Sequence, residues 1–188
     1  MRPTREDAAR ALASGDLVVY PTDTLLGLGA SALDPAAVER LERVKRRSPG
    51  QTLSIALSSV EDVERWADLS TEARAWARRR LPGPYTILVL PSALARRAFG
   101  ASIVPAGGRL GIRVPDHPVA RELARRAGPI TATSANLHGQ PPSRTPAEAR
   151  RALGTEVRVY LPATPRPSGR PSTLIDLSGA HPTAVRRS

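Results

Sequence analysis

The feature that most constrains this chain is a regular alternation of short apolar runs and capped helix patterns, which continues from one end to the other. The runs have the length of buried strands, and the stretches between them have helical periodicity. Residues 145–148, Thr-Pro-Ala-Glu, are typical of a helix start, with an N-cap, a proline at the first helical position and a capping-box glutamate. No linker and no repeat interrupts the order. This pattern predicts an α/β fold in one domain, residues 1–188, with a twisted, mixed, mostly buried sheet and helices around it.

The same pattern sets the expected boundaries. We expect strands at residues 17–20, 53–57, 85–90, 110–114, 130–133, 157–161, 174–177 and 183–186. We expect helices at residues 4–13, from 34–35 to the region of 45, and at 60–67, 70–81, 94–99, 117–128 and 145–154. In the second helix the apolar stripe is Val38, Leu41 and Val44, so Lys45 and Arg47 are predicted to point away from it. Several loops leave strand ends at one edge of the sheet, where α/β folds bind ligands.

The charge of the chain points to anionic partners. The net charge is +11, and Lys45 is the only lysine among 28 basic residues. An excess of this size favours a nucleotide, tRNA or both as partners. One Phe, two Trp and three Tyr are too few for a protein that stacks single-stranded bases on aromatic side chains. Chance alone also explains a single lysine in an arginine-rich composition.

Several classes of protein are excluded. The absence of cysteine rules out disulfides, thiolate catalysis and cysteine-based zinc sites, and three scattered histidines argue against a histidine metal site. No apolar run approaches the roughly 20 residues of a membrane span, and the N-terminus is charged. We therefore expect a soluble cytoplasmic protein with no membrane contact.

Small polar residues, glycines and cations cluster after predicted strands. After the strand at 17–20 come Thr22-Asp23-Thr24, Gly27 and Gly29, which fit either an ordinary turn or a ligand-lining loop. Lys45 and Arg47, followed by a loop that includes Gln51, fit either a solvated helix end or a phosphate clamp. Further candidates are the hydroxyl-rich segment 131–136, Ser172-Thr173, Arg186, and Arg113 within an apolar strand. An arginine at such a position needs a carboxylate partner.

The chain lacks the P-loop, the dinucleotide fingerprint, an ordered Ser–His–Asp set and any evident nucleophile or general base. A site made of cations, hydroxyls and glycines suits reactions at phosphorus, in which positioning and charge neutralisation supply most of the catalysis. The residue types therefore favour chemistry at phosphorus.

Six segments in order resemble the YrdC family of threonylcarbamoyl-AMP synthases over nearly the whole chain. They are Pro21-Thr22-Asp23-Thr24-x-x-Gly27-Leu28-Gly29, Lys45-x-Arg47, Pro82-Gly83-Pro84-Tyr85-Thr86, Gly111-x-Arg113-Val114-Pro115, Ser134-Ala135-Asn136 and Pro171-Ser172-Thr173-x-x-Asp176. The resemblance implies a YrdC-like α/β twist with a large basic concave groove. It implies the short single-domain form, with no extra C-terminal domain.

The resemblance also implies a reaction, in which ATP, L-threonine and bicarbonate give threonylcarbamoyl-AMP and pyrophosphate. The product would pass to a tRNA threonylcarbamoyl transferase complex for threonylcarbamoyladenosine synthesis. Mg²⁺ would be held through the ATP phosphates and by no protein side chain. By resemblance, threonine is held by Thr24, Arg113 and Ser172, ATP is held by Lys45, Arg47, Gln51, Ser134, Asn136 and Arg186, and Lys45 and Arg47 are the catalytic cations.

Some positions depart from the family pattern. Leu26 stands where the family usually has tyrosine, Ala56 where some members have a threonine-contacting histidine, and Arg109 where a threonine often contacts the nucleotide. Two other hypotheses fit the same sequence. One is an RNA-binding module that uses the basic groove and binds tRNA directly, in a salt-dependent manner and without ATP turnover. The other is a paralogue that has lost synthase activity.

Overall fold

The helices begin and end close to the positions that the capping signals predict. The computed structural model describes residues 3–48 and 50–185. Thr4 and Asp7 form a complete capping box, and Asp34, Ser70, His117 and Thr145 are N-caps of later helices. The helices are α1 Arg5–Ala13, α2 Pro35–Lys45, α3 Glu61–Trp66, α4 Thr71–Arg80, α5 Ala93–Ala98, α6 Pro118–Ala127, α7 Pro146–Leu153 and the 3₁₀ turn η1 Gly154–Glu156.

The strands of the described residues form one mixed sheet of ten strands, which confirms the predicted α/β class. Its order is β10-β9-β5-β6-β3-β7-β2-β1-β8, and β4 pairs with β5. Pairs β1–β8, β3–β6 and β5–β9 are parallel, and the other pairs are antiparallel. The strands are β1 Leu17–Pro21, β2 Leu26–Gly29, β3 Ser54–Ala56, β4 Ala67–Asp68, β5 Tyr85–Pro91, β6 Leu110–Arg113, β7 Ile130–Ser134, β8 Val157–Tyr160, β9 Thr173–Asp176 and β10 Thr183–Val185.

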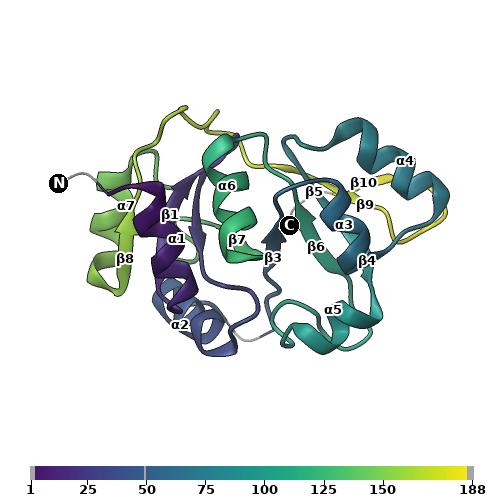
Figure 1. The fold of residues 1–188 in the computed structure, drawn as a ribbon, viewed down its shortest axis with the longest axis horizontal. Coiled ribbons are helices and arrows are strands. Elements are labelled where there is room, and N and C mark those ends of the chain that lie inside the picture. The colour runs from purple at the N-terminus through teal and green to yellow at the C-terminus, as the bar shows by residue number, and fades with distance from the viewer. Residues whose placement is uncertain (1–2, 49, 186–188) are drawn as a thin grey trace.

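The sheet runs the length of the molecule and carries a different set of helices at each end. Figure 1 shows α1, α2 and α7 around β1 and β8 at one end, and α3, α4 and α5 around β4 to β6 at the other. In β1, Leu17 and Val19 face one apolar core, while Val18 and Tyr20 face a second core under α1 and α6. Because both faces are covered, the strand is buried at every position. Among the described residues, no helix has both the length and the apolar character needed to cross a membrane.

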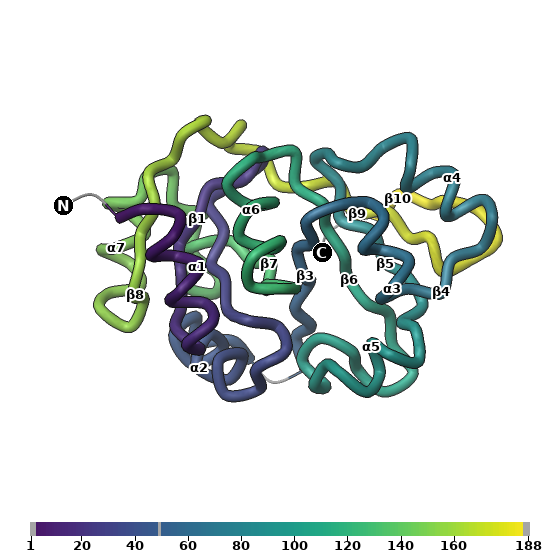
Figure 2. Tube along the Cα trace, in the orientation of Figure 1, coloured from purple at the N-terminus to yellow at the C-terminus, as the bar shows by residue number. Residues whose placement is uncertain are grey.

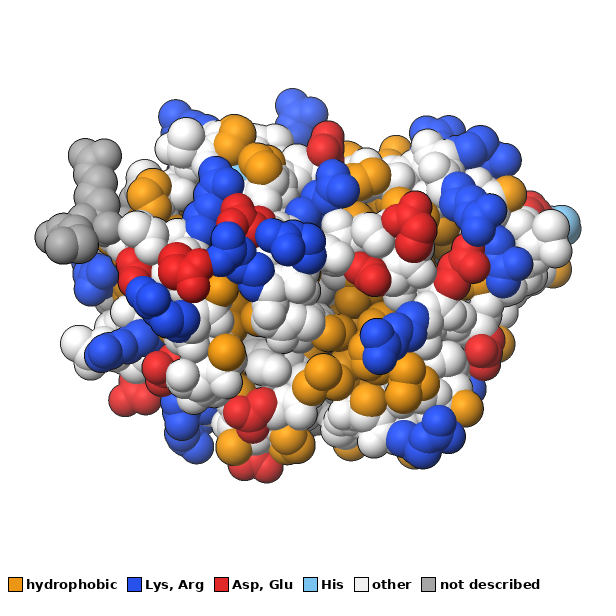
Figure 3. Space-filling model, viewed as in Figure 1, with side chains coloured by type: hydrophobic (Ala, Val, Ile, Leu, Met, Phe, Trp, Pro, Cys, Tyr) orange, Lys and Arg blue, Asp and Glu red, His pale blue; other side chains and the backbone are white. Residues whose placement is uncertain are grey.

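Charged side chains of both signs are interspersed on one face of the molecule. Figure 3 shows this mixture over the region of α1 and α6. There Glu122 accepts a hydrogen bond from Arg5 and pairs with Arg126, both at 2.9 Å, and Arg126 also pairs with Glu6. On this face part of the net positive charge is therefore paired locally.

Residues 26–29 form a strand, which corrects the prediction of a loop. Leu26 and Leu28 point into one core, and the two glycines of β2 lie under the ring of Tyr20. A Cβ atom on Gly27 would lie 2.8 Å from Tyr20 Cζ, and one on Gly29 would lie 2.9 Å from Tyr20 Cε1. The glycines therefore mark a close approach of a ring to a strand, not the end of the regular structure.

This close approach gives a prediction about stability. We expect Gly27→Ala to lower the free energy of unfolding by about 1–3 kcal/mol, because the buried Tyr20 ring must move and its hydroxyl donates a hydrogen bond to the carbonyl of Thr131. Urea denaturation measures the change. Gly179→Ala is the control, since a Cβ there meets no atom within 4 Å. A Gly27→Ala variant as stable as the wild type would show that the contact imposes no cost.

Candidate active site

A cavity of about 750 Å³, which we call the main cavity, lies over the face of the sheet. Residues of β1, β2, β3, β5, β6, β7, β9 and β10 line it, together with parts of the loops. The loops at the strand ends predict a ligand site at one edge of the sheet, but the main cavity extends beyond that edge. Its polar wall residues are Thr22, Arg47, Gln51, Thr52, Ser54, Thr86, Arg113, Thr133, Ser134, His138 and Ser172.

The loop between β1 and β2 is closed by one threonine. Thr22 Oγ1 donates to the carbonyl of Leu25 at 2.7 Å and accepts from the backbone N–H groups of Thr24 and Leu25. These bonds satisfy the polar groups of a buried turn. They also fix Asp23 and Thr24 at its tip, where both side chains meet the guanidinium of Arg113.

Arg113 has the carboxylate partner that its position in a buried strand requires. Its Nη2 donates to Thr24 Oγ1 at 2.7 Å and to Asp23 Oδ1 at 3.1 Å. The arginine is about nine-tenths buried and lines the main cavity. Asp23 Oδ2 is buried and has no hydrogen-bond partner among the described residues. Asp23 thus holds Arg113 in place, a role that sequence reasoning missed although it required a carboxylate there.

Ser172, the residue before β9, lines the main cavity. Its Oγ lies 2.7 Å from Thr86 Oγ1 on β5, in the parallel pair that joins these two strands. The hydroxyl groups of Ser172 and Thr86 and the Arg113 guanidinium are therefore on the wall of one cavity.

The loop after α2 supplies a second group of polar side chains. Arg47 Nη2 donates to the carbonyl of Thr52 at 2.9 Å, and Gln51 Nε2 lies 3.1 Å from His138 Nε2. Arg47 Nε and Gln51 Oε1 are buried and have no partner within the described part of the chain. Burial also lowers the pKa of Arg47. Polar atoms left in this state are those that a bound ligand would satisfy.

Lys45 is buried on the core side of α2, which corrects the prediction that it points away from the apolar stripe. It follows Leu41 by four residues, so it lies on the same helical face. Its Nζ donates to the carbonyls of Ser134 at 2.5 Å and Asn136 at 2.7 Å. Burial, and then the charge of Arg47, lower the pKa of Lys45 to about 8. Lys45 therefore fixes the backbone of the segment 134–136.

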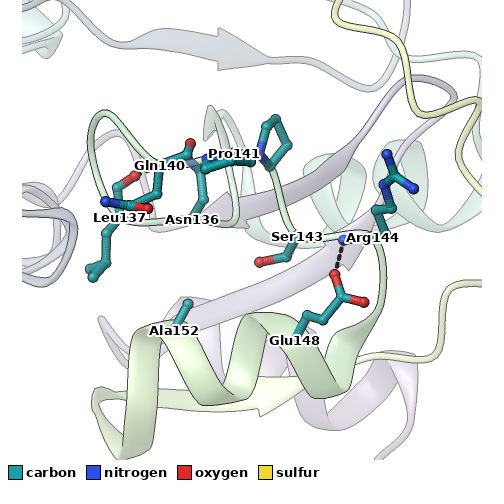
Figure 4. Close-up of a pocket in the computed structure, with 9 residues that line it drawn as sticks. Asn136, Leu137, Gln140, Pro141, Ser143, Arg144, Glu148 and Ala152 are labelled. Atoms are coloured by element: carbon teal, nitrogen blue, oxygen red, sulfur yellow. Dashed lines mark hydrogen bonds between the residues drawn. The ribbon is translucent and has the colours of Figure 1, made fainter.

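A second cavity of about 440 Å³, the side cavity, lies between the loop after β7 and helix α7. Figure 4 shows residues from Asn136 to Arg144 along one side and Glu148 and Ala152 of α7 on the other. Asn136 Nδ2 donates to the carbonyls of Leu137 and Gln140, while its Oδ1 is buried without a partner among the described residues. Ser134 lines the main cavity and Asn136 the side cavity, so this segment separates the two.

The residues predicted from the sequence fall into distinct places. Thr24 and Arg113 are in contact, and Arg113 lines the main cavity together with Ser172, Arg47, Gln51 and Ser134. Thr24 is buried behind Arg113 and is not among the described residues that line this cavity. Lys45 does not line the main cavity and instead lies behind the segment 134–136, whose carbonyls it contacts. Arg186 lies outside the described residues, and the residue before it in the sequence, Val185, lines the main cavity. Four residues with contacts at the site were not among the predicted site residues, namely Asp23, Thr86, His117 and His138. Asp23 and Thr86 had a signal, since both lie within the quoted motifs and Arg113 needed an acid.

Comparison with known proteins decides the family. The family described as "Telomere recombination" (Sua5, YciO, YrdC) matches residues 10–188. The chain belongs to this family. It is 38% identical over 183 residues to the threonylcarbamoyl-AMP synthase of Alkalilimnicola ehrlichii, covering 97% of this chain and 89% of that protein. It is 37% identical over 173 residues to that of Chromohalobacter salexigens, covering 91% of each.

The family includes solved structures with the same fold. One is that of P. abyssi Sua5 complexed with L-threonine, with a TM-score of 0.85 and 29% identity. The match covers 99% of this chain and 55% of Sua5, so the chain spans little more than half the length of that protein.

Proposed function

We propose that this chain is a threonylcarbamoyl-AMP synthase, a nucleotidyltransferase that uses ATP, L-threonine and bicarbonate. The observation that carries the proposal is the similarity to proteins of that name along nine-tenths or more of this chain. The main cavity supports it, because its wall has two arginines and many hydroxyls and no carboxylate among its described residues. We take this cavity to be the basic groove that binds both substrates.

In the proposed reaction two bonds form and two groups leave. The amine of threonine attacks the carbon of bicarbonate, which gives an N-carboxylate and releases water. An oxygen of that carboxylate then attacks the α-phosphorus of ATP, and the bond from the α-phosphorus to the bridging oxygen breaks. Pyrophosphate leaves with the electron pair. Arg47 would neutralise charge on the phosphates, and fixed cations contribute most where the charge develops.

On the threonine side, Arg113 would pair with the substrate carboxylate. The contacts of Asp23 and Thr24 hold its guanidinium before substrate arrives, so that little reorganisation is needed. Ser172 would bond to a polar group of the amino acid. On the nucleotide side, Gln51, Ser134 and Arg186 would complete the ATP contacts in the main cavity, and Asn136 would contact ATP from the side cavity. Lys45 would hold the segment 134–136 between the two cavities.

The described residues contain no group of three or more His, Asp or Glu side chains placed to hold a metal ion. We propose that Mg²⁺ arrives as the ATP complex, held by the phosphate oxygens as part of the substrate. When bound, it would reduce the negative charge that Arg47 has to offset. The product would be handed to a tRNA threonylcarbamoyl transferase complex.

The decisive experiment is an assay of pyrophosphate release with MgATP, L-threonine and bicarbonate. We expect release that requires both threonine and bicarbonate, together with threonylcarbamoyl-AMP identified by mass spectrometry. D-threonine serves as the matched control. If the protein bound tRNA in a salt-dependent manner but released no threonine-dependent pyrophosphate, the RNA-binding hypothesis would replace this one.

The pKa of Lys45 predicts how activity depends on pH. We expect kcat/KM for ATP, which reports on the free enzyme, to decline above about pH 8 as Lys45 loses its proton. The decline in kcat should lie at higher pH, because bound triphosphate favours the charged amine. Lys45→Arg should remove the decline, since arginine stays protonated. An identical decline in that variant would assign it to another group.

A further inference from the structure

The loop between β8 and β9, residues 162–171, lies against the residues that hold Arg113. We call it the proline loop. The N–H of Ser168 donates to the carbonyl of Asp23 at 3.0 Å, and that of Gly169 donates to the carbonyl of Thr24 at 2.8 Å. Figure 2 shows the loop passing the end of β1 and the start of α6 on its way to β9. It ends at Pro171, and both Pro171 and Ser172 line the main cavity.

Proline makes this loop poor in its own donors. Pro162, Pro165, Pro167 and Pro171 carry carbonyls but no N–H group. The carbonyl of Pro162 accepts from the N–H of Thr164 within the loop at 3.0 Å, whereas that of Pro165 finds its donor outside the loop. For Pro165 that donor is a side chain of another element, His117 at the start of α6.

His117 has both ring nitrogens engaged. Its Nε2 lies 3.1 Å from the carbonyl oxygen of Pro165, and its Nδ1 accepts from the N–H of Val119 at 3.3 Å as the N-cap of α6. A carbonyl can only accept, so Nε2 carries the proton and Nδ1 is the acceptor. The residue is 2% exposed. One neutral tautomer of His117 therefore makes both hydrogen bonds, to the N–H of Val119 at the start of α6 and to the Pro165 carbonyl in the loop.

We propose that His117 is a positioning residue for the threonine side of the site. It holds the Pro165 carbonyl, which keeps the proline loop against Asp23 and Thr24 and sets where Ser172 enters the main cavity. The same ring starts α6 only four residues after Arg113, so it links the two parts of the chain that would bind threonine. This role rests on the proposed function and adds to it a residue that does not touch the substrate.

The two bonds of His117 can be removed separately. Asparagine at 117 places an amide where Nδ1 lies, so it caps α6 well but is too short to reach Pro165. Glutamine places an amide nearer to Nε2, so it can donate to Pro165 but is a poor N-cap. Ser70→Ala is the matched control, because it removes the N-cap bond of α4 at another helix.

Two readouts test the proposal. Hydrogen exchange at the amides of Ser168 and Gly169 measures how often the proline loop leaves Asp23 and Thr24, without any assay of activity. The KM for threonine measures how the position of the loop affects substrate binding. We expect His117→Asn to raise both the exchange rates and the threonine KM about 10-fold, with the ATP KM changed less than twofold. We expect His117→Gln to have near wild-type values of both but a lower unfolding temperature.

The outcomes separate this proposal from the proposed function. Unchanged exchange at these two amides in His117→Asn would overturn the role of His117, whatever the enzyme does. A threonine KM that follows the unfolding temperature across His117→Asn, His117→Gln and Ser70→Ala would also overturn it, since that is the result of a structural cap alone. If His117→Asn exchanged faster but the wild type showed no threonine-dependent turnover, the proposed function would be rejected. The role of His117 in holding the proline loop would still stand.

Discussion

Replacing Lys45 with methionine is expected to lower kcat for pyrophosphate release by at least about 100-fold while the protein stays folded. The ammonium group holds the carbonyls of both Ser134 and Asn136, and these two residues face the two cavities. Without it, the segment between the cavities loses its fixed position and the nucleotide side loses a positive charge. Loss of either is costly for a reaction that depends on positioning and charge neutralisation.

The fold should survive this substitution because two effects offset each other. Two carbonyls lose a donor, which costs about 1–3 kcal/mol for a buried group left unsatisfied, but the Ser134 carbonyl keeps the N–H of Asn136 at 3.0 Å. The lowered pKa of Lys45 shows that burial of its charge is itself unfavourable, and methionine removes that cost while filling similar space. Thermal unfolding measures the stability of the variant, and steady-state kinetics measure its kcat. Arg43→Ala, an exposed change on the same helix, should keep activity within twofold. Near-normal turnover in Lys45→Met would show that the lysine is incidental.

Replacing Arg113 with alanine should raise the KM for threonine about 100-fold and leave ATP binding within about threefold. The first effect is the loss of a charge-assisted hydrogen bond to the substrate carboxylate, worth about 1.5–3 kcal/mol. The second is expected because Arg113 is held by Asp23 and Thr24 in the loop between β1 and β2, whereas Arg47 bonds to the carbonyl of Thr52 in the loop after α2. Isothermal titration calorimetry with threonine and with ATP measures the two affinities separately.

Loss of Arg113 also leaves Asp23 in a nearly closed site without its cation, so some loss of stability is expected. The double variant Arg113→Ala/Asp23→Asn removes that unpaired charge and should recover stability but not threonine binding. Arg125→Ala, which changes an exposed arginine on α6, is the control for net charge. Equal losses of ATP and threonine binding in the double variant would contradict the assignment of Arg113 to threonine.

The sequence predicts the helices well because the signals at their starts are local. Thr4 with Asp7, and Thr145 with Glu148, lie within one turn of the backbone groups they bond. The order of strands and helices, and with it the α/β class, follows from the same short-range pattern.

The sequence was misleading where a residue is explained by a distant partner. The glycines of β2 look like a loop until the ring of Tyr20, on the neighbouring strand, is placed over them. The sequence pattern predicts a solvated Lys45, because the carbonyls that accept its hydrogen bonds belong to residues about 90 positions later. Asp23 and Arg113 are likewise 90 positions apart. The motifs contain several residues of the candidate site, and only the tertiary structure shows which of them are in contact.

The burial of Lys45 has a practical consequence, since the sequence contains no other ε-amino group. With 2% of its surface exposed, it should resist amine-directed reagents as long as the segment 134–136 stays in place. The rate at which it becomes labelled would then measure how often that segment opens. An acylating reagent followed by mass spectrometry of the Lys45 peptide would read this opening directly, and slower labelling in the presence of ATP would register closure of the nucleotide side.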